Sequence, residues 1–140
     1  MEIMSLGDLL KLFLAVVIGA IVGFEREKIG KPAGLRTHIL VCLGSTLATM
    51  ISVDYFIQDS ARVVSSVVAG IGFIGAGTII AGRNTKGVVT GLTTAASIWV
   101  VGAIGIAIGV GNYSLAAVAG IIVLVILLLG RFEKSKISRK

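Results

Sequence analysis

The chain has 140 residues, of which 56% are hydrophobic, and its mean hydropathy of +1.03 is far above that of a soluble domain, so the composition predicts a membrane protein. Its net charge of +6 reflects 13 Lys and Arg residues against 7 Asp and Glu residues. Because the basic residues lie at the ends of apolar runs, topology and anionic lipids explain them better than a nucleic-acid partner, which we do not expect.

Five apolar runs approach the length of about 20 residues that a helix needs to cross a bilayer. These runs are continuous and do not alternate, which disfavours strands. We therefore expect an all-α, integral membrane bundle of about five transmembrane helices, forming a single domain over residues 1–140. The expected spans are 9–24, 35–53, 62–82, 88–110 and 113–130, the first and last being the shortest.

The distribution of basic residues predicts the orientation of these spans. Lys11 and Arg62 fall on one side of the membrane, and the other eleven basic residues fall on the opposite side. That second side would hold Arg26, Lys28, Lys31, Arg36, Arg83, Lys86, Arg131, Lys134, Lys136, Arg139 and Lys140. The N-terminus is accordingly expected outside and the C-terminus in the cytoplasm.

Small residues recur at helical spacing and predict close helix packing. They include Ala15, Gly19 and Gly23 on the first span and Gly105 and Gly109 on the fourth. Such faces indicate a tight bundle, and a homodimer is a further expectation. Trp99, which fits neither aromatic belt at the membrane surfaces, is expected to pack inside the fourth span.

The third span is rich in glycine, at Gly70, Gly72, Gly75 and Gly77, and these residues weaken a helix. The span is therefore expected either to pack closely against its neighbours or to be broken or re-entrant. The first three of these glycines match the spacing of a dinucleotide-binding loop, but that loop would follow a strand in a soluble unit. No cofactor is expected.

The residues offer little support for an enzyme. No phosphate-binding loop of the Gly-x-x-x-x-Gly-Lys-Ser/Thr type occurs. The single histidine, His38, and the single cysteine, Cys42, do not readily supply a hydrolase triad.

The segment from Glu25 to His38 is the most chemically specific part of the chain, with six ionic residues and the only proline and histidine. Glu25 and Glu27 are candidate magnesium ligands, but two positions apart on a helix they face different directions and would not chelate one ion together. Glu27 pairing with Lys31, and Arg36 pairing with Glu25, would instead make an ion-paired hairpin. Whether any metal binds is left open.

The spans lack a carboxylate near the membrane midplane, because Asp54 and Asp59 are the only acidic residues between Glu27 and Glu133. A divalent-cation carrier usually places ionisable groups along its path, so this pattern argues against autonomous magnesium transport. Carbonyl groups and hydroxyls could still line a pore. The hydroxyls concerned are those of Thr46, Thr78, Thr93 and Thr94.

Three segments together resemble the bacterial MgtC/SapB family of membrane proteins. They are Gly23-Phe24-Glu25-Arg26-Glu27 continuing to Gly34-Leu35-Arg36-Thr37-His38, then Gly70-Ile71-Gly72-Phe73-Ile74-Gly75-Ala76-Gly77, and finally Gly91-Leu92-Thr93-Thr94-Ala95-Ala96-Ser97-Ile98-Trp99. Their order and spacing cover residues from about 10 to 130.

The resemblance implies an inner-membrane protein linked to low-magnesium adaptation, either as a modulator of other membrane proteins or as a magnesium transporter. The partners that it implies are the F-type ATP synthase or a P-type magnesium ATPase. The matching positions imply a functional cluster on the cytoplasmic face. Its members are Glu25, Arg26, Glu27, Arg36, Thr37 and His38.

Two differences from the family pattern limit what the resemblance implies for this chain. Many members have a soluble ACT-like domain after the membrane portion, and none is expected within these 140 residues. Thr93 stands where some virulence-associated members carry Asn, so their partner choice is not carried over. The leading hypothesis is a regulatory membrane protein whose cluster docks a partner or a small anion, with the first turn of the second span attracting negative charge.

Overall fold

The computed structural model describes residues 4–81 and 89–137, with side chains up to Gly130. All regular elements in this part of the chain are helical. They are α1 (Leu6–Lys28), α2 (Leu35–Tyr55), the short 3-10 helix η1 (Ile57–Asp59), α3 (Ser60–Ala81), α4 (Leu92–Gly109) and α5 (Tyr113–Ile137). Each of the five α-helices is long and apolar enough to cross a membrane. The expected all-α membrane bundle is confirmed.

The helices differ from the expected spans mainly at their ends. α1 has 23 residues and α5 has 25, so the two spans expected to be the shortest are the longest helices, and α4 with 18 residues is the shortest. The reason is that apolar length measures only the part of a helix in hydrocarbon, whereas both helices continue into charged sequence. Residues 82–88, which join the third and fourth expected spans, lie outside the described residues.

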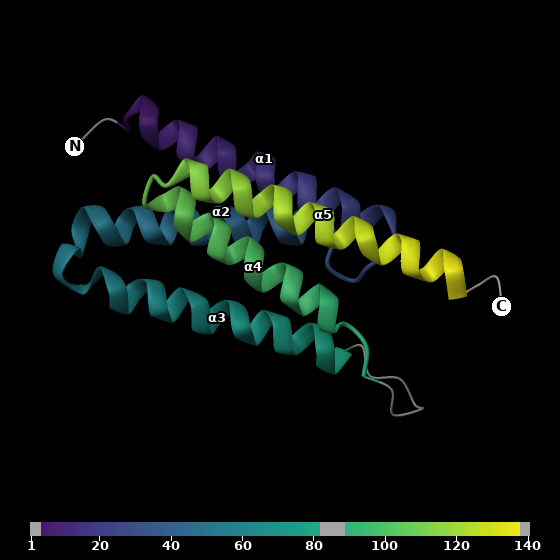
Figure 1. Ribbon diagram of the computed structural model, residues 1–140. Helices are drawn as coiled ribbons and strands as arrows, with labels where there is room; N and C mark the ends of the chain where they lie inside the picture. The colour runs from purple at the N-terminus through teal and green to yellow at the C-terminus, as the bar shows by residue number, and fades with distance from the viewer. Residues whose placement is uncertain (1–3, 82–88, 138–140) are drawn as a thin grey trace.

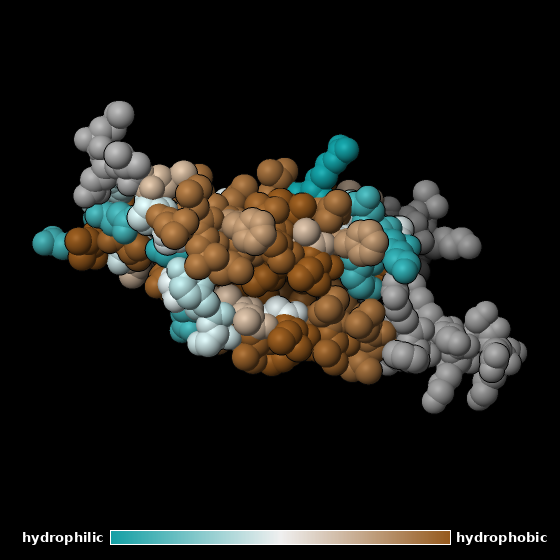
Figure 2. All heavy atoms as spheres, turned by 90° about the horizontal axis from the view of Figure 1, so that it is seen from above, coloured by the Kyte–Doolittle hydropathy of each residue, from teal (hydrophilic) through white to brown (hydrophobic). Residues whose placement is uncertain are grey.

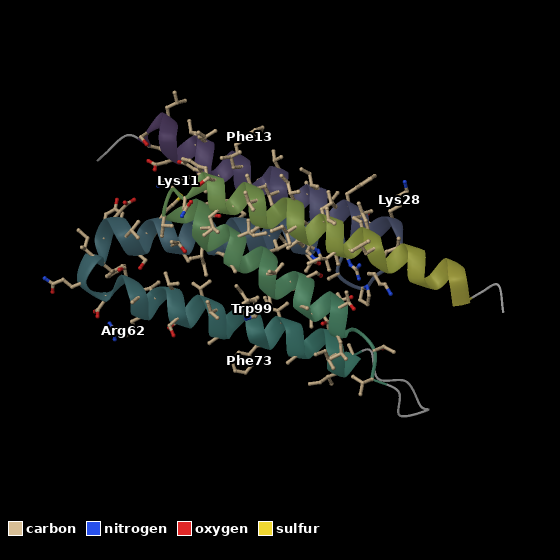
Figure 3. The ribbon with its side chains drawn as sticks, viewed as in Figure 1. Lys11, Phe13, Lys28, Arg62, Phe73 and Trp99 are labelled. Atoms are coloured by element: carbon tan, nitrogen blue, oxygen red, sulfur yellow. The ribbon has the colours of Figure 1, made fainter. Side chains whose placement is uncertain are left out.

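Successive helices run in alternating directions, so the connections gather at two ends of the bundle (Figure 1). One end holds the α1–α2 loop, the last turn of α3, the first turn of α4 and the end of α5, and we call it the charged end after its Glu25–His38 segment. Figure 3 places Lys28 at this end and Lys11 and Arg62 at the opposite one. These three positions agree with the sides assigned from charge.

The outer surface has the character of a lipid-facing surface. Apolar side chains cover the middle of the face in Figure 2, and hydrophilic ones gather toward its ends. Phe13 and Phe73 project outward, with exposed fractions of 64% and 81% (Figure 3). Trp99 lies within α4, the fourth span, but it is 48% exposed, so the expectation that it packs there against other residues is wrong. The inward face of α4 is occupied by other side chains, including Ile98, Ile104 and Ile108, which are fully or almost fully buried.

α2 lies between α1 and α4, and glycines set the distance on both sides. A Cβ atom on Gly19 or Gly23 would lie 2.8 Å from backbone atoms of α2, and one on Gly109 would lie 2.5 Å from Cβ of Thr49. Gly105 likewise packs directly on the carbonyl of Cys42. The predicted close packing is confirmed. These small-residue faces are filled by α2 of the same chain and are therefore not open to a second copy.

α3 is one continuous helix from Ser60 to Ala81, so the broken or re-entrant alternative for the third span is wrong. Only Gly75 among its predicted packing glycines meets another helix, at 3.5 Å from Cβ of Ala95. Gly70, Gly72 and Gly77 have no neighbouring atom within 4 Å of a Cβ position. A continuous helix tolerates these glycines because lipid offers its backbone no competing hydrogen-bond partner.

Candidate functional site

The last turn of α1 sends two charged side chains inward and two outward. Glu25 and Arg26 are 5% and 3% exposed, whereas Glu27 and Lys28 are exposed. The inward pair follows Gly23, whose missing side chain lets α1 approach the backbone at Leu35. Glu25 and Glu27 thus lie on different faces, as their spacing of two positions on a helix predicts.

Arg26 is a buried cation with little pairing. Its Nη1 atom lies 3.4 Å from Oε2 of Glu25, which is long for a hydrogen bond between two charged groups. Its Nε atom has no hydrogen-bond partner. A buried guanidinium is costly unless its donors are satisfied, so this side chain retains capacity for an acceptor.

Glu27 serves a different purpose from its neighbour, because it caps α2. Its Oε2 atom accepts a hydrogen bond of 2.8 Å from the backbone N–H of Leu35, the first residue of that helix. α1 stops at Lys28, and Gly30 at a φ of 66° reverses the chain with the N–H of Lys31 bonded to the carbonyl of Arg26. The expected pairing of Glu27 with Lys31 required α1 to continue, and it does not.

His38 joins α2 to α4 across 59 residues of sequence. Its Nδ1 atom lies 2.9 Å from the carbonyl oxygen of Gly34, and because a carbonyl only accepts, Nδ1 carries the proton of that bond. Its Nε2 atom lies 3.1 Å from Oγ of Ser97, which is also 2.8 Å from the carbonyl oxygen of Thr94. Because a hydroxyl has one proton, Ser97 donates to the Thr94 carbonyl when a charged ring donates from Nε2, and donates to Nε2 of a neutral ring only when the bond to Thr94 is given up.

Arg36 and Thr37 lie apart from this buried group. Arg36 is exposed on the first turn of α2 and Thr37 is half-buried, so neither shares the full burial of Arg26 and His38. The first turn of α2 also already holds the carboxylate of Glu27. The predicted cluster therefore divides into a buried part and a surface part. The buried part is Glu25, Arg26 and His38, and the surface part is Glu27, Arg36 and Thr37.

The two threonines predicted on the fourth span lie in the first turn of α4, near Arg26. Thr94 is 2% exposed and Thr93 is exposed. Both line a polar cavity with Arg26 and Lys31. The glycines of α3 contribute nothing to this cavity.

Sequence reasoning gave Lys31 a role only as an ion-pair partner of Glu27 and gave Ser97 none, although Lys31 lines the cavity and Ser97 contacts His38. Ser97 follows Thr94 by three positions, so the two share a helix face, and that spacing was the available signal. A row of buried hydroxyls on α2 was also missed, apart from Thr46, whose Oγ1 donates a 2.9 Å hydrogen bond to the carbonyl of Gly105. The row consists of Ser45, Thr46, Thr49 and Ser52.

Among the described residues, no group of three or more His, Cys, Asp or Glu side chains could hold a metal ion. The site instead combines a buried guanidinium, a histidine that bridges two helices and a helix N-terminus. These groups can bind an anion and hold three helices in register.

Known proteins resemble this chain over most of its length. A model of the MgtC family matches residues 12–135. The "Putative magnesium transporter YhiD" of Escherichia coli K12 is 42% identical over 128 residues, covering 85% of this chain and 58% of that protein. Protein SapB of Bacillus subtilis is 37% identical over 126 residues, covering 84% and 53%. Protein MgtC of Salmonella typhimurium LT2 is 36% identical over 132 residues, covering 94% and 55%.

The chain spans a little over half the length of these three relatives. No solved structure matches it.

Proposed function

This chain belongs to the MgtC family, and we propose that it acts in the bacterial cytoplasmic membrane by modulating another membrane protein in magnesium homeostasis. One observation carries the proposal. α2 is sealed against both α1 and α4 by glycines whose Cβ positions already touch the neighbouring helix. Seams of this kind leave no room for a hydrated ion between the central helices, which favours regulation over conduction.

The surface offers two places where a partner would bind. At the charged end, Glu27, Lys28 and Arg36 are exposed and can form ion pairs outside the hydrocarbon. Within the membrane, a groove of about 410 Å³ runs between α2 and α3. Gly44 and Gly70 line this groove, and because they have no side chains they leave room for a neighbouring helix. A transmembrane helix of a partner packs well against such small residues. An F-type ATP synthase or a P-type magnesium ATPase is the partner class that the family suggests.

Crosslinking in native membranes tests this docking. We expect Gly44→Leu and Gly70→Leu to fill the groove and to lower the yield of partner crosslinks from a photoreactive residue placed at Leu40. Gly77→Leu is the matched control, because Gly77 is equally open but lies outside the groove. Equal crosslink yields from all three variants would contradict docking in the groove.

Ion transport is the second candidate, and the hydroxyl row on α2 is the observation that favours it. Oγ1 of Thr49 is buried without a hydrogen-bond partner, so it has an acceptor site to offer a cation. The magnesium-transporter name borne by a relative points the same way. We expect purified protein in liposomes to show no magnesium flux above empty liposomes. Flux that Thr49→Val lowers and Ser66→Ala leaves unchanged would instead support transport.

A further inference from the structure

A polar cavity of about 260 Å³ lies at the charged end, between the α1–α2 loop and the first turn of α4. Arg26 and Lys31 line one side of it, and residues from Gly91 to Thr94 line the other. We propose that this cavity binds a phosphate group. The proposal concerns the chain alone and does not depend on a protein partner.

The α4 side supplies the N–H groups of a helix N-terminus. Gly91 precedes the helix with a φ of 89° and, as a glycine, has no side chain to cap them. The first N–H groups of a helix lack partners within it and carry the positive end of its dipole. Phosphate groups bind at such termini. At the start of α2, by comparison, the carboxylate of Glu27 accepts a hydrogen bond from the N–H of Leu35.

The α1 side supplies a buried cation with one unsatisfied donor. Arg26 is 3% exposed, lines the cavity, and has no hydrogen-bond partner at Nε. Glu25 is its ion-pair partner at 3.4 Å, but that carboxylate lines a different groove between α1 and α5. Within the described residues the cavity has no acidic lining side chain. A tetrahedral oxyanion in the cavity would meet the guanidinium of Arg26, the helix terminus and the positive charge of Lys31 together.

The size and position of the cavity narrow the ligand further. Ligand pockets for larger molecules measure about 300 to 1,000 Å³, so this one suits a single phosphate group better than a nucleotide. The cavity lies at the charged end, which the charge pattern predicts to lie at the membrane surface near lipid head groups. The phosphate would come either from a phospholipid or from free inorganic phosphate.

Calorimetry on the full chain in a maltoside detergent, which contains no phosphate, separates these sources. One arm titrates inorganic phosphate, and the other titrates phosphatidylglycerol, with diacylglycerol as the control that lacks a phosphate. Saturable binding in the first arm identifies free phosphate, and binding in the second arm alone identifies the lipid. Both results support the site. Absence of binding in both arms would overturn it.

Two lysines on the same stretch of chain provide a matched pair of variants. Lys31 lines the cavity, whereas Lys28 is exposed and lines the α1–α5 groove. We expect Lys31→Gln to weaken binding by about tenfold, since a hydrogen bond to a charged group is lost, and Lys28→Gln to leave it unchanged. Equal weakening by both variants would show only nonspecific charge attraction and would refute the site.

Arg26→Lys tests the guanidinium while keeping the buried charge. We expect it to weaken binding by about tenfold or more, because an ammonium cannot provide the paired donors of the guanidinium. Its thermal unfolding temperature serves as the check on folding. A folded Arg26→Lys protein that binds phosphate as well as the parent would rule out the part assigned to Arg26.

Discussion

At the scale of single residues, the charged end is specified by side chains that reach across the bundle. His38 contacts Gly34, the residue that precedes its own helix, and Ser97 on α4, so one ring links α2 to α4. Polar groups buried in this way fix a unique arrangement when they are satisfied and penalise it when they are not. This bridge is therefore a place where a small change has a measurable effect.

Removal of the Ser97 hydroxyl should weaken the bridge. We expect Ser97→Ala to lower the free energy of unfolding by about 0.5 to 2 kcal/mol, the range measured for hydrogen bonds between membrane helices. Ser66→Ala is the control, because Ser66 also bonds to a carbonyl of its own helix but is exposed on α3. Unfolding in a denaturing detergent provides the measurement, and equal losses would show that the bridge adds nothing.

The cap that Glu27 places on α2 should contribute less, since it is exposed to solvent. We expect Glu27→Ala to lower the free energy of unfolding by a few tenths to about 1 kcal/mol, and Glu27→Gln to retain part of that stability. The same unfolding titration measures both variants. A result in which Glu27→Gln is as damaging as Glu27→Ala would indicate that the charge alone matters.

At the scale of elements, two seams join α2 to its neighbours, and both depend on the absence of side chains. The α1–α2 seam rests on Gly19 and Gly23, and the α2–α4 seam on Gly105 and Gly109. Each glycine meets the backbone or the Cβ atom of the facing helix, which cannot move aside as the end of a flexible side chain can. The helices must separate to admit even a methyl group.

A pair of alanine substitutions tests the α1–α2 seam. We expect Gly23→Ala to lower the free energy of unfolding by about 1 to 3 kcal/mol, as overpacking does. Gly44→Ala, at a position with no neighbour within 4 Å, should leave stability unchanged or raise it by up to about 1 kcal/mol through helix propensity. Thermal unfolding in detergent provides the measurement. Equal changes in the free energy of unfolding for the two variants would contradict close packing at Gly23.

The elements were predictable from sequence to the extent that they follow local patterns. Continuous apolar runs located all five spans, and the rotation of a helix separated Glu25 from Glu27. Pairings over long distances were not predictable, such as His38 with Ser97, because helical spacing does not say which helix a face will meet. For the same reason the sequence did not show which glycine of α3 would meet another helix. Gly75 packs on Ala95, whereas Gly72 faces outward.

At the scale of the whole molecule, the orientation in the membrane remains a prediction from charge. We expect a cysteine placed at Arg62 to react with an impermeant maleimide from outside the cell, and one placed at Lys28 to react only after the membrane is opened. Cys42 is fully buried and should not react with the maleimide in either case. The opposite labelling pattern would reverse the assigned orientation.

The position of α2 between α1 and α4 also bears on how the chain enters the membrane. α2 carries the buried hydroxyls and His38, and its mean hydropathy of 1.3 is the lowest of the five helices. A segment of that polarity partitions into lipid less readily alone than beside a neighbour that covers its polar face. α1 is made first, and a Cβ atom on its Gly19 or Gly23 would lie only 2.8 Å from the backbone of α2. We therefore expect α1 and α2 to leave the translocon together as a hairpin. α4 would pack against α2 afterwards and cover the rest of its polar face.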